Sequence, residues 1–511
     1  MAKRTGAATP TPCSPSSRPA CSRPARRRIS RLEGCAMAKD IPTSRVRRGA
    51  TFGKLVAGQA VRGAGVTLSM VGDTDAQRTA RTERALADAA EDIVTVLGSM
   101  KGLAMKAGQL LSMFDLLAAF GIETMPPAQR ERFQRKLAAL YDQAPSLPFE
   151  RMRTVLEADY GRPLAKVFAE FEATPIGTAS IGQVYRARLH DGRTVAVKVQ
   201  YPGIDIAIRA DLKNLGLVLR MLRTIAPAVA DHALFRELTT HFADETDYRA
   251  EAAHHRIVAD SYRDHPFIRI PEVVTELCTA RVLVTELVEG LRFDEIVALP
   301  DADRDRVGEI VYRFYVGTMA REHCFSGDPH PGNILLAADG KVAFLDFGLF
   351  KHMDDAAVEF ELDCVRAAAE HRGAELRGLL TEYGVLEEDS PATADECLRL
   401  FYEVSGWLLT DAEIRIAADA APNAILTFVD PRRGYFDRWR REYAPAEHAF
   451  ARRVEYGTLA LLGKLRAAGN WHRIAREWCY DEPPRTELGV LEHDWLATRG
   501  RDAQGDPRHR H

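Results

Sequence analysis

Two different spacings of apolar residues alternate along the chain and predict different secondary structure. Over about 78–160 the apolar positions recur at intervals of three and four, which is typical of helices that face a core. Two runs with a period of two follow within 182–200, and Asp191-Gly192 between them is a strong hairpin signal. Helical spacing returns over about 205–262, so the first half predicts a helical segment, a hairpin and further helices.

The second half of the chain is predicted to be mainly helical, with a few short strands. RVLVTELVEG (281–290) predicts a strand, 301–324 a long helix, and KVAFLDFGLF (341–350) a short strand that ends in a glycine turn. Beyond 355 the pattern is mostly helical to about 480, and we expect the last thirty residues to be a polar tail. Strands and helices together predict an α+β protein.

Composition narrows the class of protein without naming a function. The 511 residues are 46% hydrophobic and 28% charged with a net charge of −3, which is ordinary for a globular protein and gives no electrostatic argument for nucleic acid. No run of eighteen or more uncharged apolar residues is present, so we expect no transmembrane span and a cytoplasmic protein. The eight cysteines form no CxxC pair, which favours reduced thiols over disulfides or a zinc site.

The first fifty residues differ in composition from the rest of the chain. They contain twelve Lys and Arg against two acidic residues, with Pro and Ser throughout, and such a segment cannot bury enough apolar surface to fold. The Arg- and Ser-rich composition resembles a transit peptide, although the prolines oppose an amphipathic helix. MAK recurs at Met37, so residues 1–36 are alternatively an upstream extension of a protein that starts there.

GTASIGQV (177–184) and VAVK (195–198) are the first candidates for chemistry. Small residues let backbone N–H groups approach a phosphate closely, and we place the first segment on the first strand of the hairpin. Gln183 stands where a Walker A loop requires Lys, so that loop type is excluded. On the returning strand, alternation puts Lys198 on the face of Ala196, under the small-residue loop. The alternatives are a structural turn and a lysine that points to solvent.

An acidic segment is predicted to be helical and carries Glu245, Asp247 and Glu251. Like charges four residues apart on a helix face repel by about 0.2–0.5 kcal/mol, so cations from elsewhere are expected to compensate them unless the face is simply solvated. Lys198 is the expected partner of Glu251. For the other two acids the candidate is Lys106 of KAGQ on the long N-terminal helix, where a lone lysine is otherwise usually solvated.

SGDPHPGN, which begins at Ser326, and the later DFG give the most specific signal. Asp328 and Asn333 are five residues apart, as in the D-x-x-x-x-N loop of kinases, and Asp346 follows thirteen residues later. In that arrangement Asp328 orients or deprotonates a nucleophile, while Asn333 and Asp346 hold metal ions. His330 lacks neighbouring Cys or His ligands, so a structural hydrogen bond is a better interpretation than metal binding. The order of these parts predicts nucleotide binding in a kinase-like fold.

With these motifs the chain resembles the AarF/UbiB (ADCK-type) atypical kinase-like family over about residues 95–385. The resemblance rests on KAGQ as the family's KxGQ motif, ASIGQV as its alanine-rich loop, ETDYRAEA as its ExD motif with the pairing glutamate, and on VAVK, DPHPGN and DFG. It implies a protein-kinase-like two-lobed fold with an N-terminal helical extension that carries KxGQ and a helix-rich C-terminal lobe. It also implies ATP and Mg²⁺ as cofactors.

The resemblance implies a role for each matching residue. Asp328, Lys198 and Glu251 would be catalytic, and Asn333 and Asp346 would bind the metal. The residues that would bind ATP are Gly177, Thr178, Ala179, Ser180, Ile181, Gly182, Val184, Ala196, Lys198, Glu286, Leu287 and Val288. The gating motif would comprise Lys106, Gly108, Gln109, Glu245 and Asp247.

The expected organisation has five parts: a basic N-terminal segment (1–50), the helical extension (51–165), a kinase-like N-lobe with inserted helices (166–290), a C-lobe (291–480) and the polar tail (481–511). The implied function is an ATP-dependent phosphotransferase or ATPase that supports ubiquinone or other isoprenoid-lipid metabolism. Its expected partners are a nucleotide, an isoprenoid or quinone-like lipid and a membrane surface in peripheral contact, with no nucleic acid. Two alternatives stay open: a nucleotide-gated lipid-binding scaffold, and a small-molecule phosphotransferase of the aminoglycoside or choline-kinase type.

Overall fold

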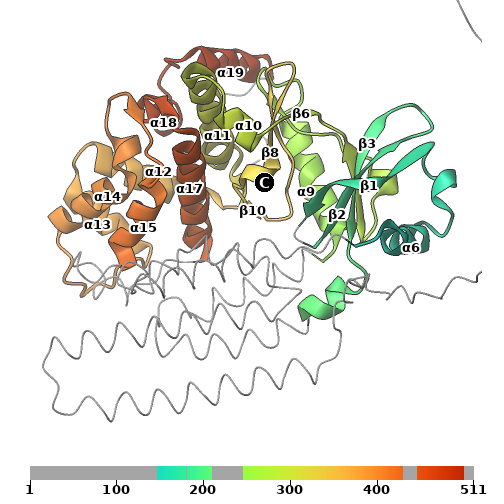
Figure 1. Ribbon diagram of the computed structural model, residues 1–511. Helices are drawn as coiled ribbons and strands as arrows, with labels where there is room; N and C mark the ends of the chain where they lie inside the picture. The colour runs from blue at the N-terminus through green and yellow to red at the C-terminus, as the bar shows by residue number, and fades with distance from the viewer. Residues whose placement is uncertain (1–146, 180, 210–245, 430–445, 500–511) are drawn as a thin grey trace, which may run out of the picture. The chain divides into compact units, whose positions relative to one another are not determined.

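A four-stranded antiparallel sheet is the first element group of the structure. The computed structural model describes residues 147–179, 181–209, 246–429 and 446–499. The sheet has the strand order β1-β2-β3-β5 (Figure 1). Its strands are β1 (Glu170–Ala179), β2 (Gly182–Arg188), β3 (Thr194–Gln200) and β5 (Val282–Glu286).

The strands β2 and β3 follow the alternation of the sequence. Val195 and Val197 are buried in the sheet, whereas Ala196 and Lys198 are only partly buried and face a cleft. The connection passes through Gly192, whose φ of +94° favours glycine. The predicted hairpin is therefore confirmed.

The strand β1 is not predicted by the sequence pattern, which places GTASIGQV on one strand. In the structure this segment instead contains the end of β1, at Ala179, a turn at Ile181, and the start of β2, at Gly182. β1 is the edge strand of the sheet, none of its residues is fully buried, and its register shifts on both sides of Pro175. An exposed edge strand that contains proline lacks the alternation of buried and exposed residues that would reveal it.

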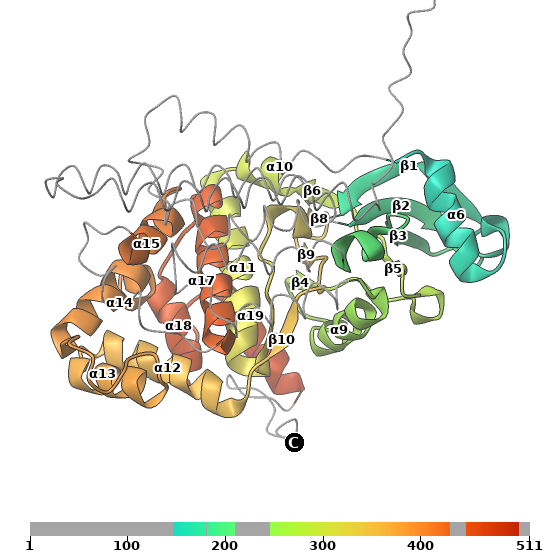
Figure 2. The same cartoon turned by 90° about the horizontal axis from the view of Figure 1, so that it is seen from below.

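Two helices flank this sheet. α6 (Phe149–Tyr160) ends at Gly161, whose φ of +63° is typical of a helix C-terminus. α9 (Tyr248–Ser261) packs against β5 and also approaches β10 (Phe350–His352), where His254 stacks on Phe350 (Figures 1 and 2). α9 therefore connects the sheet to the segment that follows DFG. The shorter elements of this region are η2 (Leu164–Lys166), a helical turn at 204–209, and η4 (Thr275–Leu277).

A second sheet carries the other motifs. Its strand order is β4-β9-β8-β6, and β7 forms a separate pair with β10. The strands are β4 (Ile268–Arg269), β6 (Gly290–Arg292), β7 (Cys324–Ser326), β8 (Ile334–Ala337) and β9 (Val342–Phe344), with η5 (Pro331–Asn333) before β8. β7 and β8 bracket the DPHPGN segment, and β9 leads directly into Asp346. The short, mostly buried strands thus fix the ends of both motifs.

Helices make up most of the remaining chain, as the sequence predicts. α11 (Asp301–Glu322) lies beside α17 (Ala446–Leu465) (Figure 2). The fully buried Tyr312 of α11 contacts three tryptophans from other elements. The other elements are α10 (Phe293–Val297), α12 (Asp355–Ala369), α13 (Gly373–Glu382), α14 (Ala394–Leu409), β11 (Ile414–Arg415), α15 (Ala420–Val429), β12 (Ala468–Gly469), α18 (Trp471–Cys479) and α19 (Glu487–Thr498). The predicted α+β architecture is confirmed.

The expectation of a polar tail over 481–511 is wrong for its first part. Residues 487–498 form α19, and Glu492 at the centre of this helix is only 2% exposed. Its carboxylate accepts hydrogen bonds from Arg313 and Arg321 of α11, at 2.9 and 2.8 Å. The inward face of this helix carries a charged residue, so the segment is polar in composition. Judged by composition alone, it therefore resembles a polar tail.

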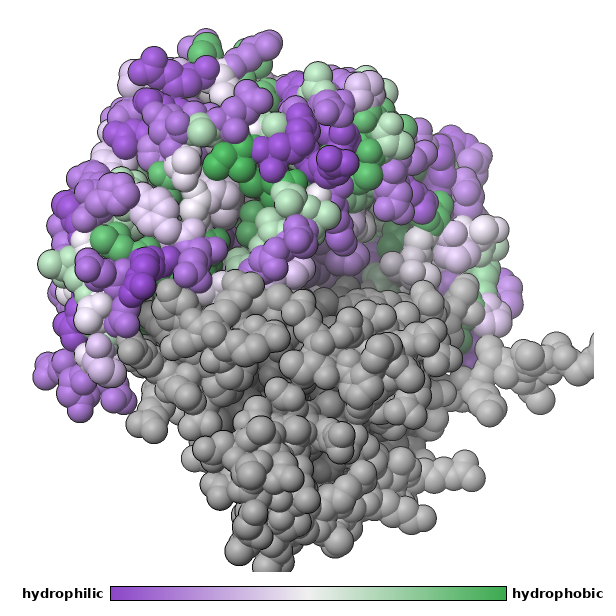
Figure 3. All heavy atoms as spheres, turned by 60° about the vertical axis from the view of Figure 1, so that its left-hand side comes forward, coloured by the Kyte–Doolittle hydropathy of each residue, from purple (hydrophilic) through white to green (hydrophobic). Residues whose placement is uncertain are grey.

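The surface of the described residues is predominantly hydrophilic. On the face shown in Figure 3, hydrophobic side chains lie in small groups between hydrophilic ones. The exposed large hydrophobic residues are spread over several elements: Ile206, Ile257, Leu291, Val297, Val490 and Leu491. Among the described helices, none combines the length and the apolar character that crossing a bilayer requires.

Candidate active site

A cleft of about 920 Å³ lies between the first sheet and the motif segments of the second, a volume within the usual range for ligand sites. Nine of the residues expected to bind ATP line it: Gly177, Thr178, Ala179, Val184, Ala196, Lys198, Glu286, Leu287 and Val288. The opposite wall includes Asp328, Asn333 and Asp346. The structure thus brings residues from 177 to 346 of the chain to one cavity.

Two residues predicted to bind ATP do not line the cleft, and a third, Ser180, lies outside the described residues. Ile181 is 2% exposed and packs beneath the turn. At Gly182 a Cβ atom would lie 2.1 Å from the carbonyl oxygen of Val199, so any other residue would push β2 away from β3. Both residues therefore shape the turn through packing, and neither contacts the cavity.

Lys198 lies at the base of the cleft between two carboxylates. Its Nζ is 2.6 Å from Glu251 and 3.0 Å from Asp346, and it lies 5.0 Å from the centroid of the Tyr248 ring. Burial alone would lower the pKa of Lys198, but the Asp346 and Glu251 carboxylates outweigh burial and hold the pKa well above its ordinary value. The lysine is therefore a fixed positive charge. The ion pair expected between Lys198 and Glu251 is present.

Glu251 belongs to the first turn of α9 and is 5% exposed. The sequence places Asp247 on the same helix face as Glu251, but Asp247 is instead the N-cap, with extended backbone and a carboxylate that accepts from the Arg249 N–H at 3.0 Å. This cap satisfies one of the free N–H groups at the helix start. Asp247 therefore fixes where α9 begins and hence where Glu251 lies.

The contact predicted between KAGQ and the ExD acids stays a prediction. Lys106, Gly108, Gln109 and Glu245 lie outside the described residues. Only Asp247 of the expected gating motif belongs to the described part of the chain, and its carboxylate accepts from the backbone of α9.

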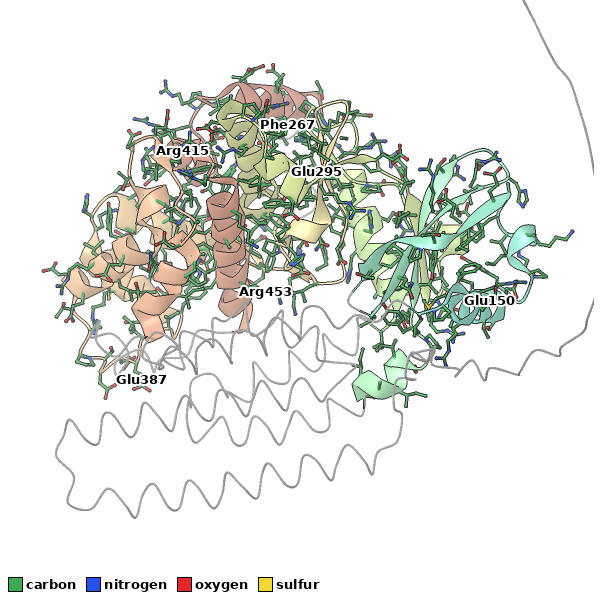
Figure 4. All side chains as sticks on the ribbon, in the orientation of Figure 1. Glu150, Phe267, Glu295, Glu387, Arg415 and Arg453 are labelled. Carbon is green, nitrogen blue, oxygen red and sulfur yellow. The ribbon has the colours of Figure 1, made fainter. Side chains whose placement is uncertain are left out.

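Asp328 is held by an arginine that the sequence did not single out. Its Oδ1 accepts from Nη2 of Arg453 at 3.1 Å, and Arg453 extends from α17 toward this segment (Figure 4). One turn further along α17, a Cβ atom at Gly457 would lie 2.4 Å from Pro329. The glycine lets the helix approach the DPHPGN segment closely enough for the ion pair to form. Because the two residues are 125 positions apart, no local pattern in the sequence predicts their ion pair.

Asn333 and Asp346 are positioned by backbone contacts around them. The Asn333 amide donates to the Asp328 carbonyl at 3.3 Å, and Asp346 Oδ1 accepts from the Gly348 N–H at 2.9 Å. Ser326 Oγ donates to the Asp346 carbonyl at 3.2 Å. The two side chains expected to hold metal therefore lie on segments that several hydrogen bonds hold in place.

The donor set fits Mg²⁺ bound together with phosphates. Asn333 and Asp346 offer amide and carboxylate oxygens, which are the hard donors that Mg²⁺ prefers. Within the described residues, no group of three or more His, Cys, Asp or Glu side chains is arranged to hold a metal. Mg²⁺ commonly takes one or two protein carboxylates and completes its shell with water and phosphate oxygens. A site of one carboxylate and one amide suits that mode.

Phe347 of DFG is fully buried and points away from the cavity. Its ring lies 4.7 Å from His255 of α9 and 6.4 Å from Phe314 of α11. Burial lowers the pKa of His255 to about 4, although Asp346 acts in the opposite direction. Phe347 thereby joins α9 to the centre of the second lobe while Asp346 faces Lys198.

The segment after β5 links the two walls of the cleft. The N–H groups of Glu286 and Leu287 donate to Glu272 and Thr194, at 2.7 and 3.2 Å. A few residues later, Nη2 of Arg292 donates to the Ile176 carbonyl of β1 at 3.2 Å. Arg292 therefore joins the second sheet to the first at the mouth of the cavity, a contact with no signal in the sequence.

Comparisons with known proteins agree with this geometry. A family model described as the ABC1 atypical kinase-like domain matches residues 139–376. The chain is 32% identical over 334 residues to "Atypical kinase COQ8B, mitochondrial" of Rattus norvegicus, covering 65% of this chain and 61% of the relative. It is 32% identical over 273 residues to "AarF domain-containing protein kinase 1" of Mus musculus, covering 52% and 49%. The matches thus span less than two thirds of these relatives.

A solved structure has a similar fold. The complex of Rv3197 with erythromycin from Mycobacterium tuberculosis superposes with a TM-score of 0.57 at 29% sequence identity, covering 80% of this chain and all of that chain. The similarity therefore extends beyond the matched domain. The resemblance of the motifs to this family is confirmed by the family model and the relatives. The two-lobed, kinase-like α+β fold class is confirmed by the family model and the solved structure.

Proposed function

Because the chain carries the ABC1 atypical kinase-like domain of the AarF/UbiB family, we propose that it binds ATP with Mg²⁺ and acts as an atypical kinase or ATPase. One observation carries the proposal: Lys198 is held between Glu251 and Asp346 at the base of a cleft lined by Asp328 and Asn333. Phosphoryl transfer needs a positioned cation, metal ligands and a carboxylate near the nucleophile, and the cleft holds all three.

The cleft offers a site for the nucleotide base next to the segment that follows β5. Val288 is 8% exposed and lines the cavity, and among the described residues its N–H has no hydrogen-bond partner. The neighbouring N–H groups of Glu286 and Leu287 are already used. Val288 is therefore the backbone donor we propose for the adenine, while Thr178 and Ala179 of the turn would cover the phosphates.

Phosphate binding would rearrange the ion pairs around Lys198. Bound Mg²⁺ would supply positive charge to the phosphate oxygens and to Asp346, which now faces Lys198 at 3.0 Å. Lys198 would then keep Glu251 as its partner and turn a donor toward the phosphates. The role of Glu251 is to hold the lysine in place, since it comes from the capped start of α9.

Asp328 would orient the attacking group. Arg453 occupies Oδ1, so Oδ2 is the oxygen that can accept a proton from the nucleophile. With water as the acceptor, an oxygen–phosphorus bond forms at the γ-phosphorus while the bond to the bridging oxygen breaks. ADP leaves with the bonding electron pair, and the proton of the water passes to Asp328 or to solvent.

Steady-state ATP turnover with Mg²⁺ tests the proposal. We expect Asp346→Asn to reduce turnover to about one hundredth or less, because it removes a charge at the site of phosphate binding. Asp303→Asn, an exposed residue in the first turn of α11, is the matched control and should retain wild-type turnover. Equal activity of the two variants would contradict the proposed function.

We further propose that the activity supports ubiquinone or another isoprenoid lipid at a membrane surface. The motif resemblance motivates this role, and the described surface offers no large apolar patch to support it. Turnover measured with and without liposomes and quinone-like phenols tests it. A rate that rises with either additive supports the lipid role, and an unchanged rate counts against it.

A second candidate is a nucleotide-gated ligand-binding protein without transfer activity. The ion pair of Asp328 with Arg453 favours it, since the arginine occupies one of the two carboxylate oxygens that could orient a nucleophile. Stabilisation by Mg·ATP without turnover would support this candidate. Because Rv3197 was solved with erythromycin, that compound belongs among the ligands tested for binding.

A further inference from the structure

His330 lies between two prolines whose positions are fixed. Pro329 packs against α17 at Gly457, where a Cβ atom would come within 2.4 Å, and Pro331 opens η5. The backbone of His330 is extended, with φ −122° and ψ 140°, as a residue before proline requires. The conformation of His330 is therefore set by its neighbours, and ordering it on ligand binding costs little entropy.

One ring nitrogen of His330 is used inside the segment. Nδ1 accepts from the Gly332 N–H at 3.1 Å and so caps η5. A nitrogen that accepts a hydrogen bond carries a lone pair, and the proton of the neutral ring is therefore on Nε2. A Cβ atom at residue 332 would lie 3.1 Å from Nδ1, so glycine there keeps the cap free of a side chain.

The other nitrogen, Nε2, has no hydrogen-bond partner in the described part of the chain. His330 is exposed and lines the cavity together with Asp328 and Asp346. With Nδ1 used as an acceptor, the ring offers its Nε2–H as a donor at the cleft.

Two strong donors near this wall are already engaged. Lys198 contacts two carboxylates, and Arg453 contacts Asp328. A terminal phosphate that lies against Asp328 would need a donor on that side, and Nε2 of His330 is one that the described residues leave available.

We propose that Nε2–H of His330 donates a hydrogen bond to the terminal phosphate of the nucleotide. The proposal rests on the proposed function, because it needs a nucleotide in this cleft. It assigns His330 a contact with substrate in addition to its structural cap. The contact discriminates ATP from ADP, since ADP lacks the phosphate that the ring would reach.

Two substitutions separate the cap from the donor. In His330→Asn the side-chain oxygen can replace Nδ1 as acceptor for Gly332, but nothing replaces Nε2. In His330→Gln the amide nitrogen reaches the place of Nε2, and the cap is lost. Thermal unfolding midpoints of both variants serve as the control for folding.

The measurement is the affinity for Mg·ATP and for Mg·ADP by calorimetry. A hydrogen bond to a charged group is worth about tenfold in affinity, so we expect His330→Asn to weaken ATP binding about tenfold relative to ADP. His330→Gln should retain more of the preference for ATP than His330→Asn. If His330→Asn keeps the wild-type ratio of the two affinities, the inference is wrong while the proposed function stands. A wild-type protein that binds neither nucleotide overturns both.

Discussion

Burial and neighbouring charge shift the pKa values of single side chains around the cleft in different directions. At Lys198 two carboxylates outweigh burial and hold the pKa well above its ordinary value. At His255, one helical turn after Glu251, Asp346 does not outweigh burial, and the pKa falls to about 4. The same α9 therefore presents a permanent ion pair to the cleft and a neutral ring to Phe347.

The neutral His255 predicts a pH dependence of stability. Its pKa is about 4 when folded and about 6.5 when unfolded, so between these values the unfolded chain binds more protons and stability rises with pH. The difference amounts to about 3 kcal/mol, fully present above pH 6.5 and lost as pH falls toward 4. We expect His255→Leu to remove this part of the slope, measured by chemical denaturation across that range.

The control for His255→Leu is a histidine in a different environment. His190 lies exposed in the turn between β2 and β3, and His190→Leu measured alongside separates the loss of any histidine from the loss of this buried one. Identical slopes for wild type and His255→Leu would contradict the assignment of the pH dependence to this ring.

Ala179 is the residue at which the turn over the phosphates differs from a glycine-rich loop. It ends β1 opposite Gly182 and lines the cleft. Glycine there would widen the backbone conformations available to the turn and remove a methyl group from the cavity. We expect Ala179→Gly to change the Kd for Mg·ATP by about threefold or more. Ala165→Gly, at an exposed position of η2, should have no effect, and an equally silent Ala179→Gly would be evidence against this role.

Among the helices, α19 supports α9 from outside the cleft. Trp495 packs edge-on against His265 at 4.4 Å and donates to the Arg263 carbonyl at 3.2 Å, and Arg499 donates to the carbonyls of Asp260 and Ser261. These carbonyls lie at the C-terminal end of α9, where they lack helical partners. The capped start of α9 and this contact at its end together fix the helix that carries Glu251.

The buried carboxylate of α19 predicts a large effect on stability. Burial would raise the pKa of Glu492, but Arg321, His265 and Arg313 outweigh it and hold the pKa far below its ordinary value. In Glu492→Gln the two buried arginines lose their shared negative charge, and we expect a loss of about 3 kcal/mol or more in the free energy of unfolding. Asp494→Asn, exposed on the same helix, should change it by less than about 0.5 kcal/mol. Equal stability of the two variants would refute the role of this ion pair.

Local patterns in the sequence predicted the elements whose signals are local. The hairpin β2–β3, the long helix α11 and the order of the motif segments follow from periodicity and turn residues. β1 escaped prediction because an edge strand with Pro175 shows no alternation. Helix α19 escaped because Glu492 makes its buried face polar.

The site was predictable where a motif fixes residue types at short spacing. Asp328, Asn333 and Asp346 line one wall because β7, β8 and β9 hold the segments that carry them. Arg453 could not be predicted, because only the packing of α17 against Pro329 brings it to the cleft. The helix cap at Asp247 was mistaken for a helical position because acidic residues suit both places.

For the molecule as a whole, the cleft depends on contacts between its two sheets. Lys198 reaches Asp346 across the cavity, and Arg292 reaches Ile176 at its mouth. A nucleotide bound between these walls would add contacts to both sides at once. Nucleotide binding should therefore raise the free energy of unfolding of the protein.

Mg·ATP should raise the free energy of unfolding by about 2.7 kcal/mol at 100 times its Kd. Lys198→Met removes the cation at the base of the cleft and should reduce this stabilisation to near zero at the same concentration. Lys166→Met, exposed in η2, should respond to Mg·ATP as the wild type does. The measurement is thermal or chemical denaturation with and without nucleotide, and a shift that survives in Lys198→Met would speak against binding in this cleft.

The buried position of Phe347 has a consequence for inhibitor design. A compound that displaces the Phe347 ring of DFG would have to remove a fully buried side chain from its contacts with His255 and Phe314. Exposing a phenylalanine costs about 1.5–3 kcal/mol, which a compound would have to recover through its own contacts. Compounds confined to Val288 and the mouth at Arg292 avoid that cost, and selective chemical probes for this protein are best sought there.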